Sequence, residues 1–199
     1  MAPPTTITHA TKDDVNHIFA LIHELASYER STSAVTITPA TLSSTLRWAP
    51  SPSSAPTGPG YAQTLLLTVP ATSSTAAPEV PSDNPVANHS YLTNNGKDEV
   101  VGMALYFTNY STWRGAPGIY LEDLFVRPVF RGRGYGTTLI AALAKETKAI
   151  GGARLEWSCL SWNEPSLKFY KGLGAEIKDG WVVLRCEGEA LEKLAVRER

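Results

Sequence analysis

The segment 119–136, IYLEDLFVRPVFRGRGYG, decides the fold of this 199-residue chain. It predicts a strand that carries two acids, Glu122 and Asp123, a break at Pro128, and a glycine-spaced turn before a helix that starts at Thr137. Glycines let the main chain approach an anion, and a helix start offers free N–H groups and the positive end of the helix dipole. The order strand, glycine turn, helix therefore predicts a phosphate-binding site.

The turn itself, RGRGYG at 131–136, matches neither of two common phosphate motifs. It lacks the Lys-Ser/Thr pair that ends a P-loop, and its glycines follow one another at every second residue, unlike those of a dinucleotide fingerprint. A run of main-chain N–H groups flanked by two guanidinium groups can nevertheless bind a pyrophosphate. The alternative is a glycine-rich hairpin turn that binds no ligand.

On either side of this segment the sequence alternates between strand and helix patterns. Thr11 with Asp14 reads as a capping box, Thr38-Pro39 as the start of a short helix, and Gly151-Gly152 as a helix end. Strands are expected at 7–8, 61–69, 99–107, 118–127, 154–160 and 181–186, and helices at about 15–26, 38–48, 137–150, 163–173 and 189–196. This interleaving predicts a mixed α/β sheet with early antiparallel pairing, including a hairpin, and a late crossover.

The length suggests a single domain, 1–199, with two inserts rich in proline, serine and threonine at about 49–60 and 70–98. Their composition predicts mobile excursions rather than a second domain.

Composition excludes several classes of function. With 18 basic and 19 acidic side chains, no charge excess favours nucleic acid or an anionic membrane as a partner. No apolar run could span a bilayer, and the N-terminus lacks the pattern of a secretory signal. Two cysteines suit a reduced, cytoplasmic protein, and no His/Cys cluster has metal-ligand spacing.

Several separated motifs follow one another in a characteristic order. Arg-x-x-Gly-x-Gly at 131–136 is followed by Trp162-Asn163 and by Phe169-Tyr170-Lys171 before a glycine. These motifs resemble the GNAT superfamily of acetyl-CoA-dependent N-acetyltransferases. The likeness extends to the diamine (spermidine/spermine) acetyltransferase branch at 24–26, 28–29, 120–123, 162–166 and 180–181. Within it, 110–115, 188–190 and 193–195 look closer to thialysine acetyltransferases. The resemblance implies an α/β fold: a GNAT-like, mixed, mostly antiparallel sheet with a splayed central strand and flanking helices.

The resemblance also implies acetyl-CoA as cosubstrate, with no metal. The main chain of Leu124, Phe125 and Val126 would pair with pantetheine. The pyrophosphate would lie against Arg131, Gly132, Arg133, Gly134, Tyr135, Gly136 and Thr137. Asn163 and Ser166 would contact the pantetheine arm or the nucleotide end, and Tyr170 the coenzyme thiol.

For catalysis, the resemblance places Glu122 as the base for the attacking amine and Tyr170 as the acid that protonates the leaving thiolate. By strand alternation Asp123 points to the opposite face from Glu122, unless a bulge turns it. The alternatives are a substrate-binding or structural role for Glu122 and a packing role for Tyr170.

An aromatic and acidic channel would suit a cationic amine. The members that the resemblance implies are Tyr28, Glu29, Trp113, Glu122, Asp123, Glu156, Asp179 and Trp181. Taken alone, Tyr28, Glu29, Trp113 or Trp181 could be an ordinary surface or core residue. An amino-acid substrate would also need a cation for its carboxylate, with Arg30 and Arg114 as candidates.

The leading hypothesis is transfer of acetyl to a primary amine of a small molecule, either a polyamine or a lysine-like amino acid such as thialysine. The alternatives are acetylation of peptide N-termini or protein lysines, and a catalytically silent CoA-binding protein. The resemblance further implies a homodimer, whose interface we expect from Trp181 onward.

Overall fold

The computed structural model describes residues 4–71 and 84–197. The chain separates into two compact units, Met1–Ser158 and Cys159–Arg199. Residues 72–83 of the second expected insert lie outside the described residues.

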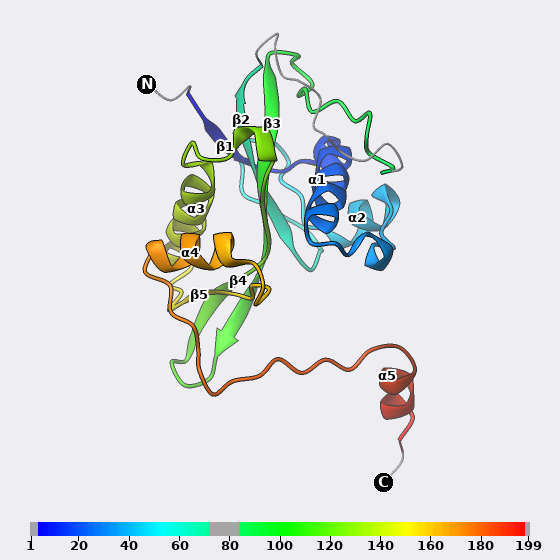
Figure 1. The fold of residues 1–199 in the computed structure, drawn as a ribbon, viewed down its shortest axis with the longest axis vertical. Helices are drawn as coiled ribbons and strands as arrows, with labels where there is room; N and C mark the ends of the chain where they lie inside the picture. The colour runs from blue at the N-terminus through cyan, green and yellow to red at the C-terminus, as the bar shows by residue number, and fades with distance from the viewer. Residues whose placement is uncertain (1–3, 72–83, 198–199) are drawn as a thin grey trace. The chain divides into compact units, whose positions relative to one another are not determined.

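The first unit is built on one five-stranded sheet in the order β1-β2-β3-β4-β5 (Figure 1). Neighbouring strands are antiparallel from β1 to β4, and β5 is parallel to β4. The strands are β1 (Thr6–His9), β2 (Gln63–Pro70), β3 (Asp98–Ser111), β4 (Ala116–Val126) and β5 (Leu155–Trp157). The predicted mixed, mostly antiparallel α/β sheet and its hairpin are confirmed.

Helices cover both faces of this sheet (Figure 1). The helices α1 (Val15–Tyr28) and α2 (Pro39–Thr45) lie on one face, and α3 (Tyr135–Ala149) lies on the other. Short 3-10 turns, Lys12–Asp14, Thr32–Ala34 and Pro128–Phe130, complete the unit.

The expected helix starts form as the sequence predicts. The Thr11–Asp14 capping box is present, and it leads through the first 3-10 turn into α1. The Thr38 hydroxyl accepts a hydrogen bond from the Thr41 N–H at 3.1 Å, so it satisfies one of the free donors at the start of α2.

A hydrophobic core between α1 and the sheet joins residues that are distant in the sequence. Ile18 and Leu21 of α1 are fully buried against strand residues such as Met103 and Phe125. Val86 and Tyr91, from the second expected insert, belong to the same core. The described part of that insert, from residue 84, therefore packs into the unit instead of leaving it as an excursion.

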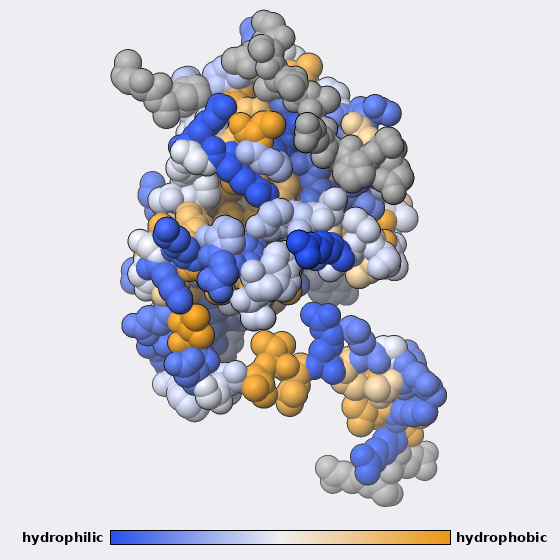
Figure 2. Space-filling view, in the orientation of Figure 1, coloured by the Kyte–Doolittle hydropathy of each residue, from blue (hydrophilic) through white to orange (hydrophobic). Residues whose placement is uncertain are grey.

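The second unit contains α4 (Glu164–Gly172) and α5 (Gly188–Ala195). The strand expected at 181–186 is not formed, because these residues pair with no strand among residues 4–71 and 84–197. Trp181, Val182, Val183 and Leu184 are 75–89% exposed, and Figure 2 shows apolar side chains gathered on this segment. A strand-forming sequence without a partner for its main-chain N–H and C=O groups does not make a ladder.

Candidate active site

Strands β4 and β5, at one edge of the sheet, stay paired over only part of the length of β4. They pair only at Ile119, Tyr120 and Leu121, and β5 ends at Trp157 while β4 continues to Val126. Main-chain groups on the β5 side of 122–126 therefore lie beyond the last pair of this ladder. This is the predicted splay, and it includes the residues expected to pair with pantetheine.

A β-bulge at Glu122 turns the acids of β4. Leu105 of β3 pairs with Asp123, and the next residue, Tyr106, pairs with Leu121, so Glu122 is the extra residue. Cross-strand partners share a face of the sheet. Leu105 packs in the core with α1, whereas the Tyr106 hydroxyl donates to Glu146 of α3. Asp123 therefore faces α1, and the bulge interrupts the simple alternation expected between Glu122 and Asp123.

Three carboxylates come together at this bulge. Burial, together with the nearby charges of Glu122 and Glu29, raises the pKa of Asp123 to about 6. Burial also raises the pKa of Glu29, which caps the C-terminus of α1. Glu122 itself is exposed. The arrangement can bind a cation, and a carboxyl with a pKa near 6 can accept a proton at neutral pH.

Two glycines of the turn have positive φ angles and open surroundings. Gly132 and Gly134 have φ of 76° and 83°, and a Cβ added at either would meet no atom within 4 Å. Glycine is favoured here by the left-handed backbone rather than by crowding. The helix α3 begins at Tyr135, two residues earlier than expected. An open turn at the start of a 15-residue helix fits an anionic diphosphate.

The two arginines of the turn bond to carbonyls close by in the chain. Arg131 Nε donates to the Val126 carbonyl at 2.8 Å, and its guanidinium lies 4.6 Å from the centre of the Tyr28 ring. Arg133 Nη2 donates to the Val129 carbonyl at 3.2 Å. The sequence predicted both as cations beside the pyrophosphate and Tyr28 as part of the acceptor channel. Arg131 now connects the end of β4 to α1.

Other expected site residues in the first unit lie at different places. Trp113, in the turn between β3 and β4, is 90% exposed. Glu156 of β5 forms an ion pair of 2.6 Å with Arg154 Nε and accepts a hydrogen bond of 2.8 Å from Asn109 Nδ2. Its charge is therefore already paired.

The remaining expected residues belong to the second unit. Asn163 caps α4, its side chain accepting a hydrogen bond of 3.3 Å from the Ser166 N–H. Tyr170 lies on α4, and Asp179 and Trp181 are exposed beyond it. Their roles stay predictions.

An aromatic pair on the α1 face of the sheet was not predicted. The rings of Phe107 and Tyr120 stack with their centroids 5.2 Å apart, and the hydroxyls of Tyr120 and Ser158 are 2.7 Å apart. The alternation of side chains along β3 and β4 could have predicted this pair, but only if the register of the β3–β4 hairpin had been known. The pair lies on the same face as Asp123, because Phe107 and Leu105 are two residues apart on β3.

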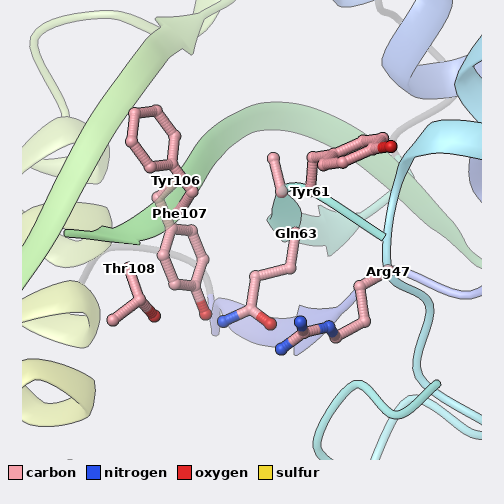
Figure 3. Close-up of a pocket in the computed structure, with 7 residues that line it drawn as sticks. Arg47, Tyr61, Gln63, Tyr106, Phe107 and Thr108 are labelled. Carbon is pink, nitrogen blue, oxygen red and sulfur yellow. The ribbon is translucent and has the colours of Figure 1, made fainter. Parts of the chain in front are cut away.

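A small cavity of about 120 Å³ opens beside the start of β2. Its lining residues are Arg47, Tyr61, Ala62, Gln63, Tyr106, Phe107 and Thr108, none of which was predicted for the site (Figure 3). The Tyr106 hydroxyl donates a hydrogen bond to Glu146 and forms a second hydrogen bond with Gln63. These hydrogen bonds join the sheet to α3.

The described part of the chain offers neither a metal-binding cluster nor a membrane-spanning helix. Among residues 4–71 and 84–197, no group of three or more His, Cys, Asp or Glu side chains could hold a metal ion. Over the same ranges, no helix has the length and apolar character needed to cross a membrane.

Comparison with known proteins defines the class. Residues 63–175 match the acetyltransferase (GNAT) family model, so this chain belongs to the GNAT acetyltransferase family. It is 32% identical over 203 residues to the L-ornithine N5-acetyltransferase of Arabidopsis thaliana, covering 93% of this chain and 85% of that protein. It is 42% identical over 99 residues to the thialysine N-epsilon-acetyltransferase of Bos taurus, covering 48% of this chain and 58% of that protein.

Solved structures show the same fold. An integron cassette protein from the mobile metagenome of V. cholerae matches with a TM-score of 0.64 at 24% identity, covering 99% of both chains. An aminoglycoside N-acetyltransferase in complex with CoA matches with a TM-score of 0.57 at 16% identity, covering 93% of this chain and 96% of that one. The predicted acyl-transferring enzyme with a GNAT fold is confirmed.

Proposed function

We propose that this enzyme moves an acetyl group from acetyl-CoA to a primary amine of a small molecule, either a polyamine or a lysine-like amino acid such as thialysine. The observation that carries the proposal is the group of three carboxylates, Glu29, Glu122 and Asp123, beside the splayed part of β4. A cationic amine would bind there next to the strand expected to pair with pantetheine. The names of the ornithine and thialysine relatives support the same substrate class.

The acceptor must lose a proton before it attacks. An alkylammonium with a pKa near ~10.4 is about 99.9% protonated at pH 7, so exposing its lone pair costs roughly 4–5 kcal/mol. Glu122 would take this proton, directly or through a water, with Asp123 as the second carboxylate of the pair. The raised pKa of Asp123 suits it to hold or pass on the same proton.

The amine nitrogen then attacks the thioester carbonyl. A C–N bond forms, the C–S bond breaks, and the thiolate takes a proton from the Tyr170 hydroxyl, while the second proton of the attacking nitrogen leaves through water and restores the phenol. A phenol with a pKa of about 10 can protonate a thiolate whose thiol has a pKa of about 8.5. No covalent enzyme intermediate is needed, because holding the reactants in line supplies much of the acceleration.

An amino-acid acceptor is favoured by Arg30, which follows Glu29. Its φ of 58° lies in the left-handed region, where glycine is the favoured residue. An arginine at this position places a cation next to the carboxylates of the site. The α-carboxylate of an amino-acid substrate would need such a cation as its partner. Arg30→Gly would then lower kcat/KM for thialysine more than for spermidine. An equal effect on both substrates would favour the polyamine.

A thiol-release screen with the purified chain tests the proposed function. We expect CoA release with thialysine, ornithine or spermidine, and a lower kcat but similar acetyl-CoA affinity for Tyr170→Phe. Turnover on peptides alone would favour the peptide or protein-lysine alternative. Tight acetyl-CoA binding without turnover on any amine would favour a silent CoA-binding protein.

We also infer a homodimer in which a second copy covers the exposed apolar run 181–184. Light scattering should show a dimer for the natural chain and a monomer for Val183→Asp, whereas a monomeric natural chain contradicts the inference. The low cysteine content and the balanced charge of the chain support a cytoplasmic location, without nucleic acid or membrane as partners.

A further inference from the structure

A buried ionic cluster lies where β4 enters the glycine turn. Arg127, the residue directly after β4, is 2% exposed, and its Nη1 lies 2.5 Å from Glu99 Oε1. Its Nε is 3.6 Å from Glu24 Oε1, and its guanidinium lies 3.9 Å from the centre of the Tyr91 ring. The four side chains come from β4's end, β3, α1 and the segment between β2 and β3.

Tyr91 connects this last segment to the cluster. Its hydroxyl donates to Glu24 Oε1 at 2.6 Å, and its carbonyl accepts a hydrogen bond from the Val100 N–H at 2.9 Å. Burial and the adjacent Glu24 carboxylate raise the pKa of the Tyr91 phenol, so it remains a hydrogen-bond donor at neutral pH. A segment whose composition predicts an excursion thus supplies one wall of the cluster.

The main chain of Arg127 is held as firmly as its side chain. Its N–H donates to the Val101 carbonyl at 3.0 Å, and its carbonyl accepts from the Phe130 N–H at 2.9 Å. In the glycine turn beyond, a Cβ at Gly132 or Gly134 would meet no atom within 4 Å, so these two residues add no packing. The direction in which the turn leaves the sheet therefore depends on Arg131, which contacts Val126 and Tyr28, and on the residues fixed at its two ends, Arg127 and the buried Tyr135.

Burying one guanidinium between two carboxylates is costly, so such clusters are poor sources of stability. They can, however, specify one conformation. We propose that Arg127, Glu24, Glu99 and Tyr91 form a positioning cluster that holds the coenzyme-binding turn in the geometry needed for the diphosphate. The identity of the ligand rests on the proposed function. The effect of the cluster on the conformation of the turn does not depend on that function.

A matched pair of tyrosine variants tests the proposal. Tyr91→Phe removes the hydroxyl that donates to Glu24 and keeps the ring beside Arg127. Tyr106→Phe removes an equally buried hydroxyl that donates to Glu146, away from the turn. The first measurement is hydrogen exchange of amides 131–137 in the full chain without ligand. The second is the Kd of coenzyme A by calorimetry, well below both Tm values.

We expect Tyr91→Phe to speed exchange in the turn and to raise the Kd of coenzyme A about tenfold. Tyr106→Phe, with a similar loss in Tm, should change neither. Unchanged turn exchange in Tyr91→Phe, or equal changes in both variants, overturns the proposal. Failure of the natural chain to bind coenzyme A refutes the proposed function instead, and the exchange data still decide whether the cluster positions the turn.

Discussion

The guanidinium of Arg131 stacks 4.6 Å from the ring centre of Tyr28 while its Nε donates to the Val126 carbonyl. One side chain of the glycine turn therefore joins the end of β4 to the last turn of α1. The next residue of α1's C-terminus, Glu29, belongs to the carboxylate group beside Asp123. The expected coenzyme turn and acceptor site are thus connected through the same end of one helix.

Arg131→Lys should weaken this connection, because lysine keeps the charge but loses the planar guanidinium and its Nε–H. We expect a loss of about 1–2 kcal/mol in unfolding free energy and about a tenfold rise in the Kd of acetyl-CoA. Denaturant unfolding and calorimetry measure the two effects. Arg185→Lys, in an exposed ion pair, is the control. An unchanged Kd would mean that charge alone matters at Arg131.

Gly134→Ala should weaken coenzyme binding through strain. At φ 83° an alanine costs about 1 kcal/mol, although its Cβ would meet no neighbour. Gly58→Ala is a matched control, since Gly58 has φ 78° and equally open surroundings in the 49–60 segment. Both variants should lose similar stability, and only Gly134→Ala should raise the Kd of acetyl-CoA. A similar rise in Gly58→Ala would contradict the turn assignment.

Asp123→Asn should stabilise the protein at pH 8 and not at pH 3. The pKa of Asp123 is about 6 in the folded protein against an ordinary value of 3.8, so the unfolded chain ionises first as the pH rises. Stability is therefore lost between about pH 4 and 6, by up to about 3 kcal/mol. Urea unfolding of the natural chain and the variant at both pH values measures this. A variant that is less stable at pH 8 would contradict the raised pKa.

His89 should make the protein sensitive to mild acid. Burial lowers the pKa of His89 to about 4, assisted by the charges of His17 and Arg127, and its ring also packs against Tyr91. The unfolded chain binds the proton first, so stability is lost as the pH falls from about 6.5 to 4. For this half-buried group we expect about 1–2 kcal/mol.

The test of this acid sensitivity is the difference in unfolding free energy between pH 7.5 and 5. His89→Gln should show a smaller difference than the natural chain. The remaining difference would come from His17, whose pKa is also lowered by burial, with Asp14 opposing. An equal difference in the variant and the natural chain would assign the effect elsewhere.

Local patterns predicted much of the fold because the interactions behind them are local. The capping box at Thr11–Asp14, the Thr38-Pro39 helix start and the glycine turn each depend on residues within one turn of the chain. The site was less predictable. Whether Asp123 shares a face with α1 depends on the bulge at Glu122, which is a property of the register between β3 and β4.

The expected strand at 181–186 also shows that a local pattern does not determine tertiary pairing. Its sequence is typical of a strand, but a strand forms only where another strand supplies the hydrogen bonds. Likewise, proline-rich composition suggested an excursion at 70–98, yet Val86 and Tyr91 are in the core. Burial of a few side chains such as these is enough to pack part of a proline-rich segment against the core.

By itself, the sequence determined the order of strands and helices as far as α4, the glycine turn between β4 and α3, and the family, because these depend on residues adjacent in the chain. Only the tertiary structure decided which acids meet at the bulge, that Arg131 contacts Tyr28, and that Tyr91 packs against Arg127. These contacts join residues far apart in the sequence. Strand register and the packing of buried charges determine which of these residues meet, and neither can be predicted from a local sequence pattern.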